Sequence, residues 1–112
     1  MKEEPNSKIL RVVPREKAFY FFTSTGNYTG EGAASLKEFM EKINTVTAKS
    51  LEFHLSRGDF EKWVADVLED KKLALDILRL QRSNLTGDNL RRQLFSTISR
   101  RYKELLGGPS LR

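Results

Sequence analysis

Four consecutive aromatic residues, Phe19, Tyr20, Phe21 and Phe22, constrain the fold of this chain more than any other feature. β-Strands favour aromatic side chains, and successive side chains of a strand point to opposite faces. Residues 17–23 are therefore predicted to form a strand with Phe19 and Phe21 on one face. A half-buried strand needs an apolar surface on one face only, so the second face, with Tyr20 and Phe22, requires more core, a partner chain or a flat ligand.

Capping signals and the helical spacing of apolar residues predict four helices after this strand. Ser35 and Glu38 form a capping box, which predicts a helix through Asn44. Ser56 is predicted to cap the next helix, with Asp59 three residues later. The last two predicted helices cover residues 71–83, after a cap at Asp70, and residues 84–106, beginning at Thr86 or Asp88.

Residues 48–56 alternate apolar and polar side chains, which predicts a second half-buried strand. Its leucines and Phe53 would face the core, and His54 would point to the opposite side. Two other segments are predicted to be a glycine-rich loop, residues 24–34, and a short strand or extended segment, residues 8–14.

Short loops throughout predict one α+β domain, with a small antiparallel sheet packed against four or so helices. Along the chain we expect a flexible N-terminus at residues 1–8, a core at 9–83, a C-terminal helix at 84–106 and a flexible tail at 107–112. The C-terminal helix is basic and amphipathic, so it either docks on its own core or also joins a homodimer or homotetramer. The candidate residues for such assembly are Leu94, Ile98, Tyr102 and Leu105.

The positive charge of the chain is concentrated in its C-terminal part. Residues 71–112 carry ten Lys or Arg against three Asp or Glu, a net charge of +7, whereas residues 1–70 carry ten against twelve, a net charge of −2. A basic segment on a folded domain favours a polyanionic partner, although a solvated helix face explains it equally well. Abundant Lys, Arg and Glu without Cys also fits a heat-adapted host.

Several classes of protein are disfavoured by composition. The chain lacks Cys and has one histidine, His54, so we expect no disulfide, no metal site and no cofactor. Its polar start and the lack of a long apolar run predict a soluble, cytoplasmic protein that does not enter membranes. An enzyme acting through His54 with Glu52 or Ser56 is conceivable, but no nucleophile motif supports it, and we expect a non-enzymatic protein.

An aromatic floor with a basic rim would suit single-stranded nucleic acid. Bases stack on aromatic side chains with about 1–3 kcal/mol each and without sequence preference, while cations neutralise the phosphates. The candidate floor consists of Tyr20, Phe22, Tyr28 and Trp63, and the candidate rim of Lys17, Lys49, Arg57, Arg79 and Arg82. Spacing alone slightly favours the alternative, in which helices cover Tyr20 and Phe22.

The segments KAFYFFTSTGNYTGEGAASLKEF and SLEFHLSRGDFEKWV resemble a group of small, mostly archaeal domains, and FH-x-x-RGDFE-x-W is their most distinctive part. Over residues 15–83 the chain is similar to the ThermoDBP-related family of thermophilic single-stranded DNA-binding proteins. This resemblance implies an apolar DNA-binding cleft flanked by basic residues, and a C-terminal helix used in assembly. It would place Tyr20, Phe22 and Tyr28 in the cleft, Trp63 in its wall, and His54 and Arg57 at its edge. The C-terminal helix here is short, which favours a compact dimer or tetramer over a long zipper.

Together, the residues and the resemblance predict a protein that binds single-stranded DNA, or RNA, without sequence specificity and without a cofactor. The alternative is a protein–protein interaction module whose exposed aromatic and basic residues hold another protein.

Overall fold

The computed structural model describes residues 5–107, and side chains from residue 7 onward. Within this range the predicted α+β class is confirmed, with one two-stranded antiparallel sheet and a long C-terminal helix. The elements in chain order are α1 (Pro5–Leu10), η1 (Arg15–Lys17), β1 (Phe19–Ser24), β2 (Asn27–Ala33), α2 (Leu36–Ile43), α3 (Ala48–Arg57), α4 (Asp59–Trp63), η2 (Val64–Leu68), α5 (Lys71–Gln81) and α6 (Gly87–Leu105).

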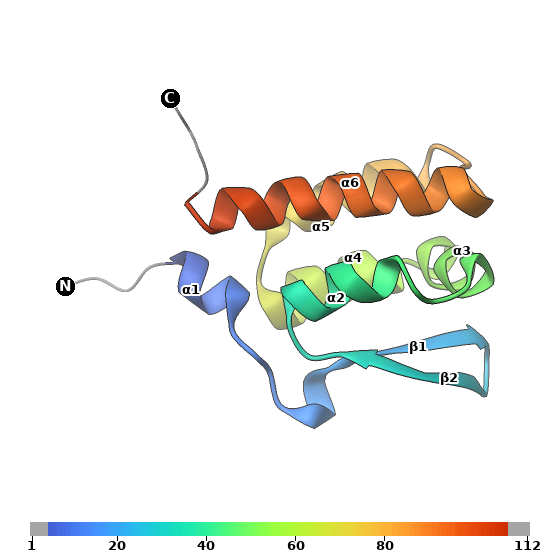
Figure 1. Ribbon diagram of the computed structural model, residues 1–112, viewed down its shortest axis with the longest axis horizontal. Coiled ribbons are helices and arrows are strands. Elements are labelled where there is room, and N and C mark those ends of the chain that lie inside the picture. Colours follow the sequence, from blue (N-terminus) through green and yellow to red (C-terminus); the bar gives the residue numbers. More distant parts are fainter. Residues whose placement is uncertain (1–4, 108–112) are drawn as a thin grey trace.

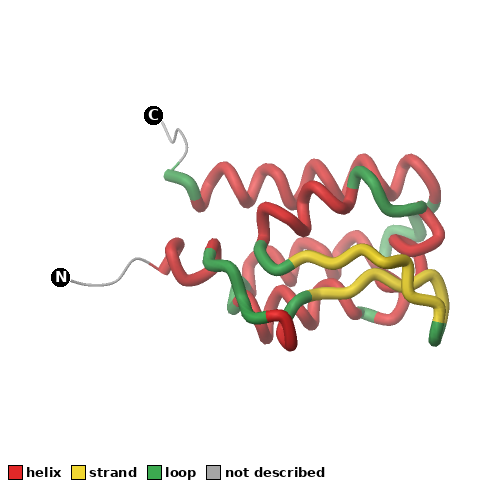
Figure 2. The backbone as a smooth tube through the Cα atoms, turned by 60° about the horizontal axis from the view of Figure 1, so that its bottom comes forward, coloured by secondary structure: helices red, strands yellow, loops and turns green. Residues whose placement is uncertain are grey.

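The elements form three layers (Figure 1). The β1–β2 hairpin makes one outer layer, α2, α3 and α4 make the middle one, and α5 with α6 makes the other outer layer. Figure 2 shows the hairpin lying over the middle helices. The core between the layers is closely packed and rich in aromatic rings; its largest fully buried side chains include Phe21, Phe39, Phe60, Leu51, Ile77 and Leu94.

The first strand forms as predicted. Phe19 and Phe21 are buried, while Tyr20 and Phe22 on the other face are only partly buried. The prediction of a loop over residues 24–34 is wrong, because residues 27–33 pair with β1 as the second strand. The glycines make the register of this pairing irregular without preventing it. At Gly32 a Cβ atom would lie 3.0 Å from the Tyr20 ring, so the lack of a side chain lets that ring lie on the neighbouring strand.

The predicted strand at residues 48–56 is also wrong, because these residues form α3. The side chain of Thr47 accepts a hydrogen bond from the Ser50 N–H and caps the helix. Gly58 ends the helix in the left-handed conformation, with φ 79°. The buried residues of α3 have the spacing of one helix face: Ser50, Leu51, His54 and Leu55. The sequence of this segment fits both this helical spacing and the alternation of a strand.

The caps agree with the sequence at three places and differ at one. Ser35 caps α2 and Asp70 caps α5, each by accepting a backbone N–H three residues later, and Thr86 occupies the N-cap position of α6. Ser56 does not cap a helix, since it lies inside α3, and Gly58 separates α3 from α4 instead. The chain is therefore helical on both sides of Gly58, and this junction orients the residues around it.

The N-terminal predictions are partly corrected. Residues 5–10 form helix α1 instead of a flexible end and the start of a strand. Ile9 and Val13 are buried against the rest of the core, which explains why this segment is ordered. The predicted flexible segments at residues 1–4 and 108–112 lie outside the described residues.

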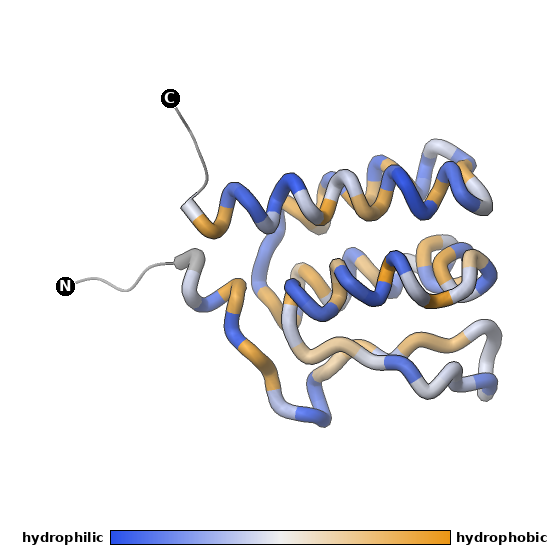
Figure 3. Tube along the Cα trace, in the orientation of Figure 1, coloured by the Kyte–Doolittle hydropathy of each residue, from blue (hydrophilic) through white to orange (hydrophobic). Residues whose placement is uncertain are grey.

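Helix α6 packs one face into the core of its own chain. Of the residues predicted for assembly, Leu94 and Ile98 are fully buried, Leu105 is 4% exposed, and Tyr102 is partly buried. Within this chain those side chains already have an apolar environment, so they do not form an exposed stripe. Figure 3 shows hydrophilic residues recurring along the rest of the helix. Among the described helices, none has both the length and the apolar composition for crossing a bilayer.

Candidate functional site

A groove of about 550 Å³ lies along β1, between the hairpin and the helices α3 and α4. Its lining combines aromatic residues from three of these segments: Phe19, Tyr20 and Phe22 from β1, Phe53 from α3, and Trp63 from α4. A volume of this size is in the range of small-molecule sites, and it opens to the surface. The groove thus answers what the second aromatic face of β1 contacts, since Tyr20 and Phe22 border an open, largely apolar depression.

Tyr28 extends the aromatic surface beyond the groove. Its ring centroid lies 5.9 Å from that of Tyr20 and 5.4 Å from that of Phe22, and the residue is 51% exposed. It does not line the groove itself. These three residues form a continuous aromatic face on the hairpin, which we call the hairpin aromatic face.

The α3 side of the groove carries a cation over an aromatic ring. Phe53 and Arg57 are four residues apart and therefore neighbours on the helix surface. The Arg57 guanidinium carbon lies 5.0 Å from the centroid of the Phe53 ring, a cation–π distance. The Arg57 side chain is 54% exposed, so part of its hydrogen-bonding capacity remains available to a ligand.

His54 connects β1 to α4 through hydrogen bonds of its two ring nitrogens. Its Nε2 accepts a hydrogen bond from the Phe22 N–H at 2.8 Å, so the proton of the neutral ring is on Nδ1, which donates to Asp59 Oδ2 at 2.8 Å. Burial lowers the pKa of His54, although the carboxylate of Asp59 acts in the opposite direction. Because both ring nitrogens are occupied by β1 and α4, His54 is a buried link between the two sides of the groove.

The pairing of His54 with Glu52 or Ser56 that sequence analysis considered does not occur. Glu52 accepts the Gly87 N–H at the start of α6, and the Ser56 hydroxyl donates to the Phe53 carbonyl. Both lie at a smaller depression of about 300 Å³ that His54 does not line. The helical turn separates side chains that an extended strand would have aligned.

Trp63 lines the groove on its α4 side. Its side chain is 7% exposed, and its Nε1–H donates to the Lys17 carbonyl oxygen at 2.7 Å. This bond ties α4 to the segment before β1. It also places the backbone of Lys17 beside the groove, although the Lys17 side chain does not line it.

The charged lining of the groove is balanced in sign. Arg57 and Lys62 contribute two positive charges, and Asp59 and Asp66 contribute two negative ones. Three of the predicted rim residues lie elsewhere: Lys49 is in the first turn of α3, and Arg79 and Arg82 are at the end of α5. The structure therefore does not bring the basic C-terminal segment to the groove.

Several groove residues are not among those predicted from the sequence, chiefly Phe53, Asp59, Lys62 and Asp66. Phe53 was assigned to a buried strand face because residues 48–56 alternate. The signal that identifies it is the Thr47 cap together with Gly58, since a helix between them puts Phe53 and Arg57 on one face. Within the described residues no group of three His, Cys, Asp or Glu side chains is arranged to hold a metal ion.

A protein-family model matches residues 16–108, a range that includes every groove residue named above. The matching model is described as a family of unknown function, DUF5752. Comparison with curated proteins and with solved structures finds no match. Because the family model spans most of the chain, this protein belongs to the DUF5752 family.

Proposed function

We propose that this protein binds single-stranded nucleic acid, with bases seated in the aromatic groove. The observation that carries the proposal is the juxtaposition of Tyr20 and Phe22 with Phe53 and Trp63 around one open depression. Every nucleobase has a flat face, so such a surface binds strands without sequence preference. The resemblance of residues 15–83 to single-stranded DNA-binding proteins supports the same function.

Stacking is expected to supply more of the affinity than charge at the groove. Arg57 and Lys62 are positioned to contact phosphates, but Asp59 and Asp66 offset them. The Asp59 carboxylate is partly neutralised by Arg57, whose Nε lies 3.1 Å away. Salt should therefore weaken binding at the groove only modestly. The slope of log affinity against log salt concentration should be about −0.7 for each phosphate neutralised.

Intrinsic fluorescence offers a direct test, since Trp63 is the single tryptophan and lines the groove. Titration with an unlabelled oligothymidine should quench its emission, and a duplex of equal length should not. The variant Tyr20→Leu/Phe22→Leu keeps an apolar surface and removes two stacking faces. Its affinity should fall by at least about tenfold, because each stacked base contributes about 1–3 kcal/mol.

A matched control is Phe95→Leu, which removes an aromatic ring from α6, outside the groove. It should leave the affinity unchanged. Circular dichroism and the urea midpoint establish that each variant is folded. If the folded Tyr20→Leu/Phe22→Leu protein binds oligothymidine as tightly as the unmodified protein, stacking in the groove is wrong.

The second candidate function is a protein–protein interaction module. The balanced charge of the groove lining favours it, because an apolar cleft with both signs at its edge suits a peptide as well as a base. A Trp63 emission that no DNA or RNA oligonucleotide alters, up to millimolar concentration, would favour this alternative over nucleic acid.

The proposal includes action in the cytoplasm and assembly as a homodimer or homotetramer. Since Leu94 and Ile98 are fully buried, an assembly surface must use other residues, and light scattering of the purified protein gives the number of subunits.

A further inference from the structure

The outward face of α6 carries positive charge without any carboxylate. Polar positions that fall within about 120° of the helix circumference make up this face, which we call the α6 basic face. They are Asn89, Arg92, Gln93, Ser96, Ser99, Arg100 and Lys103, all exposed except for the partly buried Ser99. The other two arginines of the helix serve the fold instead: Arg91 donates to the Ile43 and Val46 carbonyls, and Arg101 binds Asp70.

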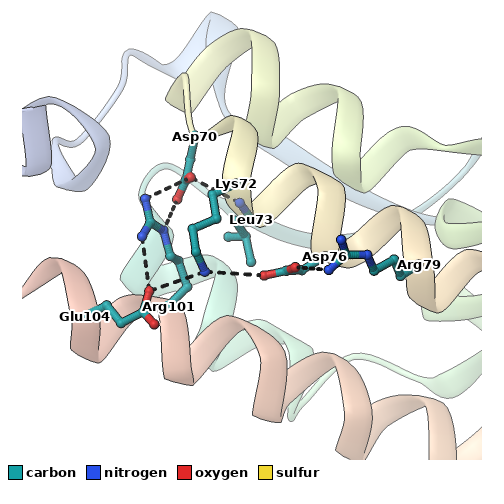
Figure 4. A network of polar contacts seen from close by, with 7 residues as sticks. All are labelled: Asp70, Lys72, Leu73, Asp76, Arg79, Arg101 and Glu104. Carbon is teal, nitrogen blue, oxygen red and sulfur yellow. Dashed lines mark hydrogen bonds and ion pairs between the residues drawn. The ribbon is translucent and has the colours of Figure 1, made fainter.

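In the layer formed by α5 and α6, the carboxylates other than Asp88, in the first turn of α6, already form ion pairs with Lys or Arg (Figure 4). An ion-pair network along the α5–α6 contact contains all of these pairs: Asp70 with Arg101, Asp76 with Lys72 and Arg79, and Glu104 with Lys72 and Arg101. Within residues 5–107, Arg92, Arg100 and Lys103 form no ion pair. These three positive charges therefore do not stabilise the fold through ion pairs. They belong to residues 71–112, the segment with a net charge of +7.

The side-chain types on this face are those that contact nucleic-acid backbones. Arg and Lys neutralise phosphates, and Ser, Asn and Gln donate hydrogen bonds to phosphate and sugar oxygens. The face extends over about 21 Å from residue 89 to residue 103, at 1.5 Å per residue. It contains no apolar side chain on which a protein partner would bury surface.

From these observations we infer that the α6 basic face is a second contact surface for nucleic acid, which binds the sugar–phosphate backbone. The inference rests on the proposed function for its choice of polyanion, but it concerns a different surface. The groove is formed by the hairpin and the middle helices, whereas α6 lies in the opposite outer layer (Figure 1). A single molecule therefore contacts two strands, or two distant segments of one strand, and bridges them.

The test compares two variants with the same change in charge. Arg92→Gln/Arg100→Gln/Lys103→Gln removes three positive charges from the α6 basic face, and glutamine preserves helix propensity. The matched control is Lys37→Gln/Lys49→Gln/Lys71→Gln, at three exposed positions outside both the groove and this face. Fluorescence anisotropy of labelled oligothymidine is measured over a salt series, and Trp63 quenching is recorded in parallel.

The α6 variant should lower the slope of log affinity against log salt concentration by about 2, from three lost phosphate contacts at about 0.7 each. The control should lower it by less than about half as much. Trp63 quenching at saturation should persist in both variants. Energy transfer between two oligonucleotides carrying donor and acceptor dyes should be weaker with the α6 variant than with the unmodified protein.

Equal salt slopes for the α6 variant and the control would overturn this inference and leave the groove proposal intact. Conversely, salt-dependent binding that needs the α6 basic face but never quenches Trp63 would support the inference and refute the groove as the binding site. The single substitutions Arg92→Gln, Arg100→Gln and Lys103→Gln, each expected to change the slope by about 0.7, decide the question should the triple variant be unstable.

Discussion

The hairpin side and the α5–α6 side of this small domain present opposite surfaces to solvent. The hairpin side exposes aromatic rings around a groove whose charged lining is balanced. The α5–α6 side buries most of its aliphatic residues and exposes cations, and its carboxylates other than Asp88 are held in a network of ion pairs. The exposed aromatic rings and the excess of positive charge thus lie on opposite sides of the domain. The chain-wide charge of +5 therefore does not predict the charge of either side.

Breaking the ion-pair network should have the largest effect on stability. Arg101 binds both carboxylate oxygens of Asp70, at 2.9 and 3.2 Å, and the Asp70 side chain is 1% exposed. In Arg101→Ala this buried carboxylate loses its cation, so the free energy of unfolding should fall by about 3–5 kcal/mol in urea denaturation. Arg79→Ala, which breaks an exposed pair with Asp76, should change it by at most about 1 kcal/mol. Equal losses for the two variants would contradict this distinction.

Truncation of the buried face of α6 should have a slightly smaller effect. Leu94 is fully buried, and Leu94→Ala should lower the free energy of unfolding by about 2–5 kcal/mol by leaving a cavity. Leu75→Ala, at a position that is 50% exposed on α5, should change it by about 0.5 kcal/mol or less. Calorimetry or urea denaturation measures both. A Leu94→Ala protein with unchanged stability and altered subunit number would instead assign this residue to an interface.

The hairpin side should show the smallest effect, as a dependence of stability on pH. Burial lowers the pKa of His54 in the folded state below its ordinary value of 6.5, so the unfolded chain binds more protons just below pH 6.5. The contribution of His54 is therefore complete above pH 6.5 and is lost as pH falls through the folded-state pKa. The loss is at most about 1.4 kcal/mol per pH unit for one proton.

His54→Gln removes this titration and serves as the reference for the pH measurement. Urea denaturation between pH 5.5 and 7.5 should show a steeper rise of stability with pH for the unmodified protein than for the variant. Parallel curves for the two proteins would mean that His54 binds protons equally in the folded and unfolded states, which would contradict this prediction.

The contrast between the two sides also explains what the sequence allowed us to predict. The face of a single helix is a local property, so the caps at Ser35 and Asp70 and the bounds of the last helix were predicted closely. The groove depends instead on β1, α3 and α4 meeting in space. Its β1 residues were identified because Phe19 and Phe21 had already accounted for the buried face of that strand.

The main error came from a segment that satisfies two periodicities. Leu51 and Leu55 fit one face of a helix as well as alternate positions of a strand, and the added Phe53 made alternation look complete. Local capping by Thr47 and Gly58 decides between the two, together with burial of His54 against β1. The prediction of a rim from Lys49, Arg79 and Arg82 failed for a related reason, since net charge along the chain carries no information about which layer a helix joins.

The hydrogen bond from the Phe22 N–H to His54 also affects whether the edge of β1 can pair with a strand of another chain. A two-stranded hairpin has outer edges whose unpaired backbone groups are templates for strands of other chains. At the middle of β1 the imidazole takes up the N–H that an incoming strand would need, and a side chain from α3 thereby covers the edge. Replacement of His54 by an apolar residue would leave this N–H without its acceptor, and we expect the variant to pair with strands of other chains more readily than the unmodified protein does.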